Sequence, residues 1–137
     1  MHQIIYALVE AESEAEALEE ATVTFDRPEK RNALTLEALR SFREALDRGA
    51  EEARVIVVRG AGDAFCAGDD IASVAGLGDE VAPGTLATRL YDALFGPEQV
   101  EVPVIAAVDG PAYGGGFEIV AAADLAIATA GATFALP

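Results

Sequence analysis

Residues 105–125 read I-A-A-V-D-G-P-A-Y-G-G-G-F-E-I-V-A-A-A-D-L. The apolar start of this stretch predicts a buried strand that breaks at Gly110, and residues 114–123 predict a helix that opens on three glycines. The first amides of a helix have no acceptor within the helix, and glycines let a ligand approach them closely. Because the helix dipole also favours negative charge at this end, the stretch predicts a binding site for an oxyanion.

A second loop of small residues lies earlier in the chain. Residues 54–59 (R-V-I-V-V-R) predict a strand covered on both faces, and residues 64–71 (A-F-C-A-G-D-D-I) follow shortly after it. Loops at the carboxyl ends of adjacent parallel strands converge, so one amide from each loop can bind the same oxygen. Taken alone, this loop would be interpreted as an ordinary turn. The three glycines at residues 114–116 could serve only close packing, but each helical glycine costs about 1 kcal/mol relative to alanine, which makes that explanation less attractive. The two loops together therefore favour a functional site.

The rest of the chain predicts alternating strands and helices. Strands are predicted over residues 3–9, 21–25, 103–108, 125–129 and 133–136, and helices over residues 35–49 and 85–95. In the first helix, Thr35 is the predicted N-cap and Gly49 the predicted end. Residues 10–20 are acidic and rich in alanine, and they predict a solvated turn, a short helix or a flexible lead-in. We expect an α/β fold in one domain, residues 1–137.

Composition argues against several classes of function. The 137 residues carry a net charge of −15, so nucleic acid is not an expected partner. The apolar stretches are shorter than the roughly 20 residues of a membrane-spanning helix, and the N-terminus lacks a secretory pattern, so we expect a cytoplasmic protein without a membrane segment. His2 and Cys66 are the only residues of their types. They provide neither a plausible nucleophile–base pair nor a zinc site, and Cys66 is expected to be a small buried thiol.

Three ordered motifs resemble those of the crotonase superfamily, the enoyl-CoA hydratase/isomerase family. They are the glycine stretch at 105–125, the loop F-C-A-G-D-D-I at 65–71, which is similar to F-x-A-G-x-D-[LI], and the segment D-R-P-E-K-R-N-A-L at 26–34, which is similar to R-P-x-x-x-N-A-L. The resemblance implies a crotonase-like spiral of ββα turns, truncated before the C-terminal helices. Those helices close the pocket and mediate trimerisation in the family, so a homo-oligomer, either a trimer or a dimer of trimers, is expected when they are present.

The resemblance also implies roles for particular residues. The two oxyanion-binding amides match Ala67 and Gly115, and Glu118 matches a catalytic acid/base. Lys30 and Arg31 match contacts to coenzyme A, and the alternative is that they are two solvated loop cations. The positions implied to bind substrate are Lys30, Arg31, Ala67, Gly68, Asp69, Asp70, Ile71, Gly114 and Gly115. No metal is expected, and no cofactor beyond the coenzyme A that the substrate carries.

The motifs leave the reaction open. The implied substrate is an acyl-CoA thioester whose enolate is held by the amides, and the leading prediction is hydration of a 2-enoyl-CoA by an enoyl-CoA hydratase-like lyase. Hydratases of the family use a second glutamate after the proline of a segment that matches residues 134–137, and the sequence ends at that proline. An enoyl-CoA isomerase, which can use one carboxylate, therefore remains an alternative. So does an inactive fragment, or a module for CoA binding or assembly that needs a partner.

Overall fold

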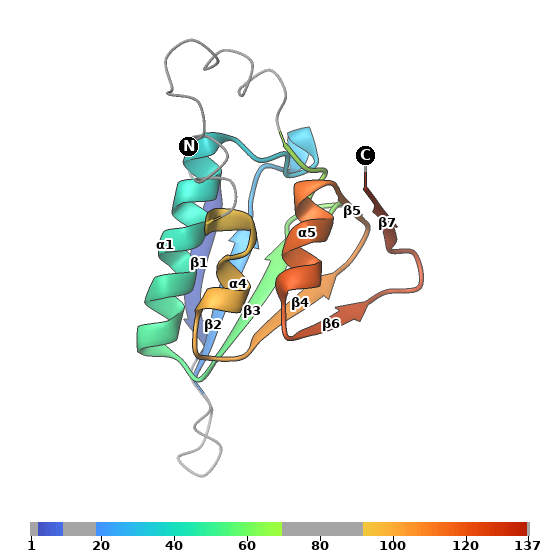
Figure 1. Cartoon of the computed structure of the whole chain (residues 1–137). Coiled ribbons are helices and arrows are strands. Elements are labelled where there is room, and N and C mark those ends of the chain that lie inside the picture. Colours follow the sequence, from blue (N-terminus) through green and yellow to red (C-terminus); the bar gives the residue numbers. More distant parts are fainter. Residues whose placement is uncertain (1–2, 10–18, 70–91, 137) are drawn as a thin grey trace.

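The computed structural model describes residues 3–9, 19–69 and 92–136 (Figure 1). The strands are β1 (Ile4–Val9), β2 (Glu20–Phe25), β3 (Val55–Gly60), β4 (Val104–Val108), β5 (Pro111–Tyr113), β6 (Leu125–Ala128) and β7 (Thr133–Ala135). The helices are the short 3-10 helix η2 (Pro28–Lys30), α1 (Leu36–Glu52), α4 (Gly96–Gln99) and α5 (Gly115–Ala122). Residues 92–94, just before α4, are also helical.

The strands form two sheets. The larger sheet has the order β1-β2-β3-β4-β6, with β1 antiparallel to β2 and every other neighbouring pair parallel. Strands β5 and β7 form a separate parallel pair. Figure 1 shows α1, α4 and α5 on one face of the larger sheet, as expected when helical crossovers join parallel strands. The predicted α/β class is confirmed.

The core lies between these helices and the larger sheet. Alternate side chains of β2, β3 and β4 are buried under the helices, as the two-residue period of a strand requires; they are Ala21, Val23, Phe25, Ile56, Val58, Val104, Ala106 and Val108. Phe25 packs against Phe42 of α1 and edge-on against Phe65, with ring centroids 5.2 and 5.6 Å apart. On the opposite face of β3, Arg59 is exposed. The prediction that this strand is covered on both faces is therefore wrong for the described structure.

Helix α1 begins where the sequence predicts but ends later. The Thr35 side chain accepts a hydrogen bond from the Ala38 amide at 3.1 Å, which confirms the predicted N-cap. The predicted end at Gly49 is wrong, because the helix continues to Glu52. A Cβ on Gly49 would lie 2.9 Å from Cγ1 of Ile56 in β3. This glycine therefore allows the helix to approach the sheet closely and does not end it.

The remaining predicted elements within the described residues agree with the structure to within one or two residues at their ends. Helix α4 and strand β5 were not predicted, because elements of four and three residues are too short to show a periodic pattern. Most of the predicted acidic segment, residues 10–18, and most of the predicted helix 85–95 lie outside the described residues. Within the described ranges, no helix is long and apolar enough to cross a membrane.

Candidate active site

The two glycine-containing loops lie side by side, as the parallel topology predicts. The amides of Phe65 and Cys66 both donate to the Pro111 carbonyl, at 3.0 and 3.1 Å. The Tyr113 amide in turn donates to the Cys66 carbonyl at 2.9 Å. These bonds join the loop after β3 to β5, and they place residues 67–69 beside the start of α5.

The three glycines at the start of α5 have different structural roles. Gly114 has a φ of 53° and a ψ of −121°, a conformation that side chains rarely adopt. A Cβ on Gly116 would overlap the Cys66 carbonyl oxygen, so this glycine permits close packing of α5 on the loop. A Cβ on Gly68 would lie only 3.6 Å from the Gly115 nitrogen, which shows how closely the loop approaches the helix start. Close packing therefore explains Gly116, whereas Gly114 and Gly115 shape the beginning of the helix, where Gly114 is half-buried and Gly115 is buried.

The backbone amides at this contact differ in whether they have acceptors. The Ala67 amide donates to the Arg31 carbonyl at 2.9 Å. The prediction of Ala67 as an oxyanion donor is therefore corrected, because its N–H is already used. Among the described residues, no acceptor is found for the Gly115 amide, which begins α5, or for the Asp69 amide. The available pair is thus Asp69 and Gly115, with Asp69 two residues beyond the predicted position.

The direction of the Asp69 amide follows from how its loop is held. The Leu34 amide donates to the Gly68 carbonyl at 2.7 Å, and Leu34 pairs with Asp69 in an isolated parallel bridge. In such a bridge one residue, here Leu34, makes the hydrogen bonds, and the amide of its partner points away from it. A Cβ on Gly115 would lie 3.2 Å from Oδ1 of Asp69, so the two residues are neighbours.

These residues border a pocket of about 340 Å³. It is lined by Ala67, Gly68, Asp69, Tyr113, Gly114, Gly115, Ala135 and Leu136. The Gly114 amide donates to the Ala135 carbonyl at 2.8 Å, and this bond brings β7 to the edge of the pocket. Tyr113, Ala135 and Leu136 were not predicted as site residues, because their proximity depends on the pairing of β5 with β7.

Burial changes the acidity of two side chains at the site. Partial burial raises the pKa of the Asp69 carboxyl above its ordinary value, because loss of solvation penalises the charged form. Burial also raises the pKa of the Cys66 thiol to about 12. The thiol donates to the Asn32 carbonyl, with its sulfur 3.3 Å from the oxygen, and the side chain is fully buried. Cys66 is thus the predicted buried thiol, protonated at neutral pH and unsuited to act as a nucleophile.

None of the other predicted site residues that the structure describes lines this pocket. Glu118 is half-buried on α5, and its amide donates to the Gly114 carbonyl at 3.0 Å. Lys30 and Arg31 are exposed at the end of η2, and Arg31 borders a separate pocket that also contains Gly62 and Pro111. Asp70 and Ile71 lie outside the described residues.

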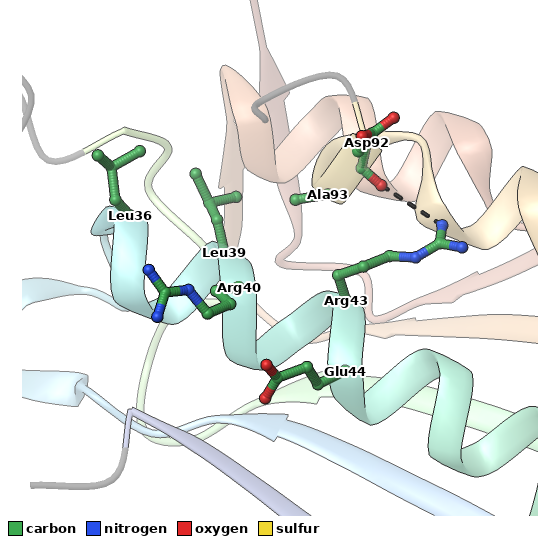
Figure 2. A pocket seen from close by; sticks show the side chains of 7 residues that line it. All are labelled: Leu36, Leu39, Arg40, Arg43, Glu44, Asp92 and Ala93. Atoms are coloured by element: carbon green, nitrogen blue, oxygen red, sulfur yellow. Dashed lines mark hydrogen bonds between the residues drawn. The ribbon is translucent and has the colours of Figure 1, made fainter. Parts of the chain in front are cut away.

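Another pocket, of about 350 Å³, lies between α1 and residues 92–93 (Figure 2). It is lined by Leu36, Leu39, Arg40, Arg43, Glu44, Asp92 and Ala93. Arg43 donates to the Asp92 carbonyl at 3.4 Å and to Oε1 of Gln99 at 3.0 Å, so its guanidinium links α1 to the region of α4. The lining includes none of the predicted site residues.

The fold and the site define a class of protein. It is an α/β protein with a mostly parallel sheet, in which the amides of Asp69 and Gly115, without acceptors among the described residues, border one pocket. A sequence model of the enoyl-CoA hydratase/isomerase family matches residues 18–137. The chain therefore belongs to the enoyl-CoA hydratase/isomerase family, and the predicted resemblance is confirmed.

Known relatives support this assignment. Probable enoyl-CoA hydratase EchA14 of Mycobacterium tuberculosis is 42% identical over 117 residues, which cover 83% of this chain and 45% of that protein. Enoyl-CoA hydratase EchA19 of the same organism is 38% identical and covers 83% of this chain and 44% of that protein. The crystal structure of an enoyl-CoA hydratase/isomerase from Xanthobacter autotrophicus Py2 matches with a TM-score of 0.84 and 31% identity, covering 99% of this chain and 49% of that chain. The chain spans about half the length of the relatives that it matches.

Proposed function

We propose that this chain carries the oxyanion-binding part of an enzyme that acts on acyl-CoA thioesters through an enolate, and that its reaction is the hydration of a 2-enoyl-CoA. The observation that carries the proposal is the pair of amides on Asp69 and Gly115, which have no acceptor among the described residues and border one pocket. Relatives named enoyl-CoA hydratases support the choice of substrate class.

The two amides would act on the thioester carbonyl oxygen. When water adds to the β-carbon of the enoyl group, an electron pair moves through the α-carbon onto this oxygen, which becomes an enolate. Two N–H groups fixed by the fold stabilise this charge more than they stabilise the neutral carbonyl, which lowers the barrier. Loss of one such donor typically costs about 10²–10³ in rate.

Glu118 is the proposed acid/base. It lies on α5 three residues beyond Gly115, so it follows the oxyanion site by about one helical turn. Its carboxylate would take the proton from the attacking water, and a proton delivered to the α-carbon would then complete the addition. Lys30 and Arg31 are proposed to contact the CoA phosphates, where cations would offset the negative charge of the protein.

A second candidate is an enoyl-CoA isomerase. Glu118 is the one carboxylate on the helix that bears the Gly115 amide, and a 1,3 proton shift can be carried out by a single carboxylate. The same amides would hold the dienolate. Product analysis with 2-enoyl and 3-enoyl thioesters separates the two reactions.

The test is a comparison of two glutamate variants in the complete protein that contains this chain. Glu118→Gln should lower kcat for hydration of a 2-enoyl-CoA by at least about 10²-fold, in line with the loss of a general acid/base. Glu37→Gln is the matched control, because Glu37 is also in the first turn of a helix but is exposed on α1. Normal hydration by Glu118→Gln would refute the role of Glu118, and no turnover of either thioester by the wild type would refute the proposed function.

A further inference from the structure

We propose that Asn32 is a positioning residue for the oxyanion site. It holds the loop of residues 61–69 in the shape that directs the Asp69 amide toward the pocket shared with Gly115. The inference rests on the proposed function for its catalytic consequence. The hydrogen bonds that support it can be tested separately from turnover.

Asn32 is buried and satisfied entirely by backbone groups of its surroundings. The residue is 2% exposed, and its Nδ2 lies 2.9 Å from the carbonyl oxygens of Ala61 and Ala64 and 3.2 Å from that of Phe65. Its Oδ1 accepts from the Arg27 amide at 2.8 Å. A side-chain amide has two N–H donors and one carbonyl, so both ends of the group are used.

The backbone of Asn32 is as specific as its side chain. Its φ is 57°, in the left-handed region that asparagine tolerates better than most residues with a Cβ. This conformation turns the chain so that the neighbouring Arg31 carbonyl accepts from the Ala67 amide at 2.9 Å, and the Leu34 amide reaches the Gly68 carbonyl at 2.7 Å. The side chain and the flanking backbone therefore bind successive points of the same loop, up to the residue before Asp69.

The loop is held from two sides, and each side has a different effect. Strand β5 binds Phe65 and Cys66, which fixes the distance of the loop from α5. Asn32 binds the carbonyls on the other side, where the loop leaves β3, and so fixes the course of the chain before Gly68 and Asp69. Without the Nδ2 donors, the buried carbonyls of Ala64 and Phe65 and the half-buried carbonyl of Ala61 lose this partner, and the loop is free to move relative to the Gly115 amide.

The test uses two substitutions at Asn32 and a nearby control in the complete protein. Asn32→Asp keeps the shape but places a carboxyl oxygen where Nδ2 donated. Asn32→Gly keeps access to the left-handed conformation and removes the side chain. Thr35→Ala is the control, because it also removes side-chain hydrogen bonds from the same segment. The Thr35 hydroxyl accepts from the Ala38 amide and donates to Oε1 of Gln3, and neither partner belongs to the 61–69 loop.

Three readouts distinguish positioning from general stability. Both Asn32 variants should lower kcat by about 10- to 100-fold, the range expected from misplacing a catalytic group by about 1 Å. The dissociation constant of CoA alone should change less than about threefold, as expected when uniform binding is kept. The infrared C=O stretch of a bound 2-enoyl-CoA labelled with ¹³C at the thioester carbonyl should move back toward its value in water. Thr35→Ala should leave all three unchanged.

A folded Asn32 variant with wild-type kcat and a wild-type carbonyl frequency would overturn the inference. Failure of both Asn32 variants to fold would also overturn it, by assigning the residue to stability alone. If the wild type itself shows neither turnover nor a shifted carbonyl frequency, the proposed function fails. The Asn32 inference is then decided by NMR in the folded variants, where the Asp69 amide resonance should shift far more than that of an amide in α1.

Discussion

Replacing Gly116 by alanine should push α5 away from the loop that carries the Asp69 amide. A Cβ at this position would lie 2.8 Å from the Cβ of Cys66 and would overlap the Cys66 carbonyl oxygen. Carbon atoms in contact prefer a separation of about 3.5–4.0 Å, so the helix or the loop must move by about 1 Å. The obstructing atoms belong to the backbone and to a Cβ, and neither can be moved aside by rotating a side chain.

Two opposing contributions set the size of the effect on stability. Overpacking of this kind typically costs about 1–3 kcal/mol, while alanine is favoured over glycine inside a helix by about 1 kcal/mol. Because the overlap involves backbone atoms, we expect a net loss of about 1–2 kcal/mol in the free energy of unfolding. Urea denaturation followed by circular dichroism measures this loss.

Gly131→Ala provides the matched control, because a Cβ on Gly131 would meet no atom within 4 Å. It should leave the free energy of unfolding unchanged within about 0.5 kcal/mol. In the complete protein, Gly116→Ala should also lower the hydration rate by about 10²-fold, since Asp69 and Gly115 would be about 1 Å out of place. A Gly116→Ala protein that is as stable as the wild type, or more stable, would show that helix propensity dominates and would refute the packing argument.

Two further predictions concern titratable groups at the site. Burial raises the pKa of Asp69 in the folded chain, so its ionised form destabilises the fold at neutral pH, and this penalty disappears as the pH falls through the raised pKa. Asp69→Asn should therefore be more stable than the wild type at pH 7, and this advantage should disappear below the pKa of the carboxyl in the unfolded chain. Urea denaturation at both pH values measures the difference in the free energy of unfolding between the variant and the wild type. An equal difference at the two pH values would contradict this prediction. The Cys66 thiol is buried and has a pKa of about 12. It should therefore resist a thiol reagent at pH 8 in the folded protein and react once urea unfolds the chain. Rapid labelling before unfolding would contradict this and show that the loop opens.

Much of the fold follows from local patterns in the sequence. Apolar runs and caps predict β2, β3, β4 and α1 because a strand repeats every two residues and a helix every 3.6, whatever the rest of the chain does. Thr35 is identified as an N-cap for the same reason, since the bond that it accepts comes from a residue three positions away. Gly49 shows the limit of such rules, because this position requires a glycine for its close contact with Ile56 on β3 and not for ending the helix.

The candidate site likewise combines features that follow from the sequence with features that depend on the tertiary structure. The sequence by itself predicted that two loops rich in small residues follow parallel strands, and it placed Gly115 in the first turn of a predicted helix, residues 114–123, whose first amides have no acceptor within the helix. Only the tertiary structure decided that the Arg31 carbonyl occupies the N–H of Ala67, which leaves the Asp69 amide as the proposed second donor. A motif specifies residue types, whereas the direction of an amide depends on the hydrogen bonds that distant segments, here residues 31–34, make with the loop.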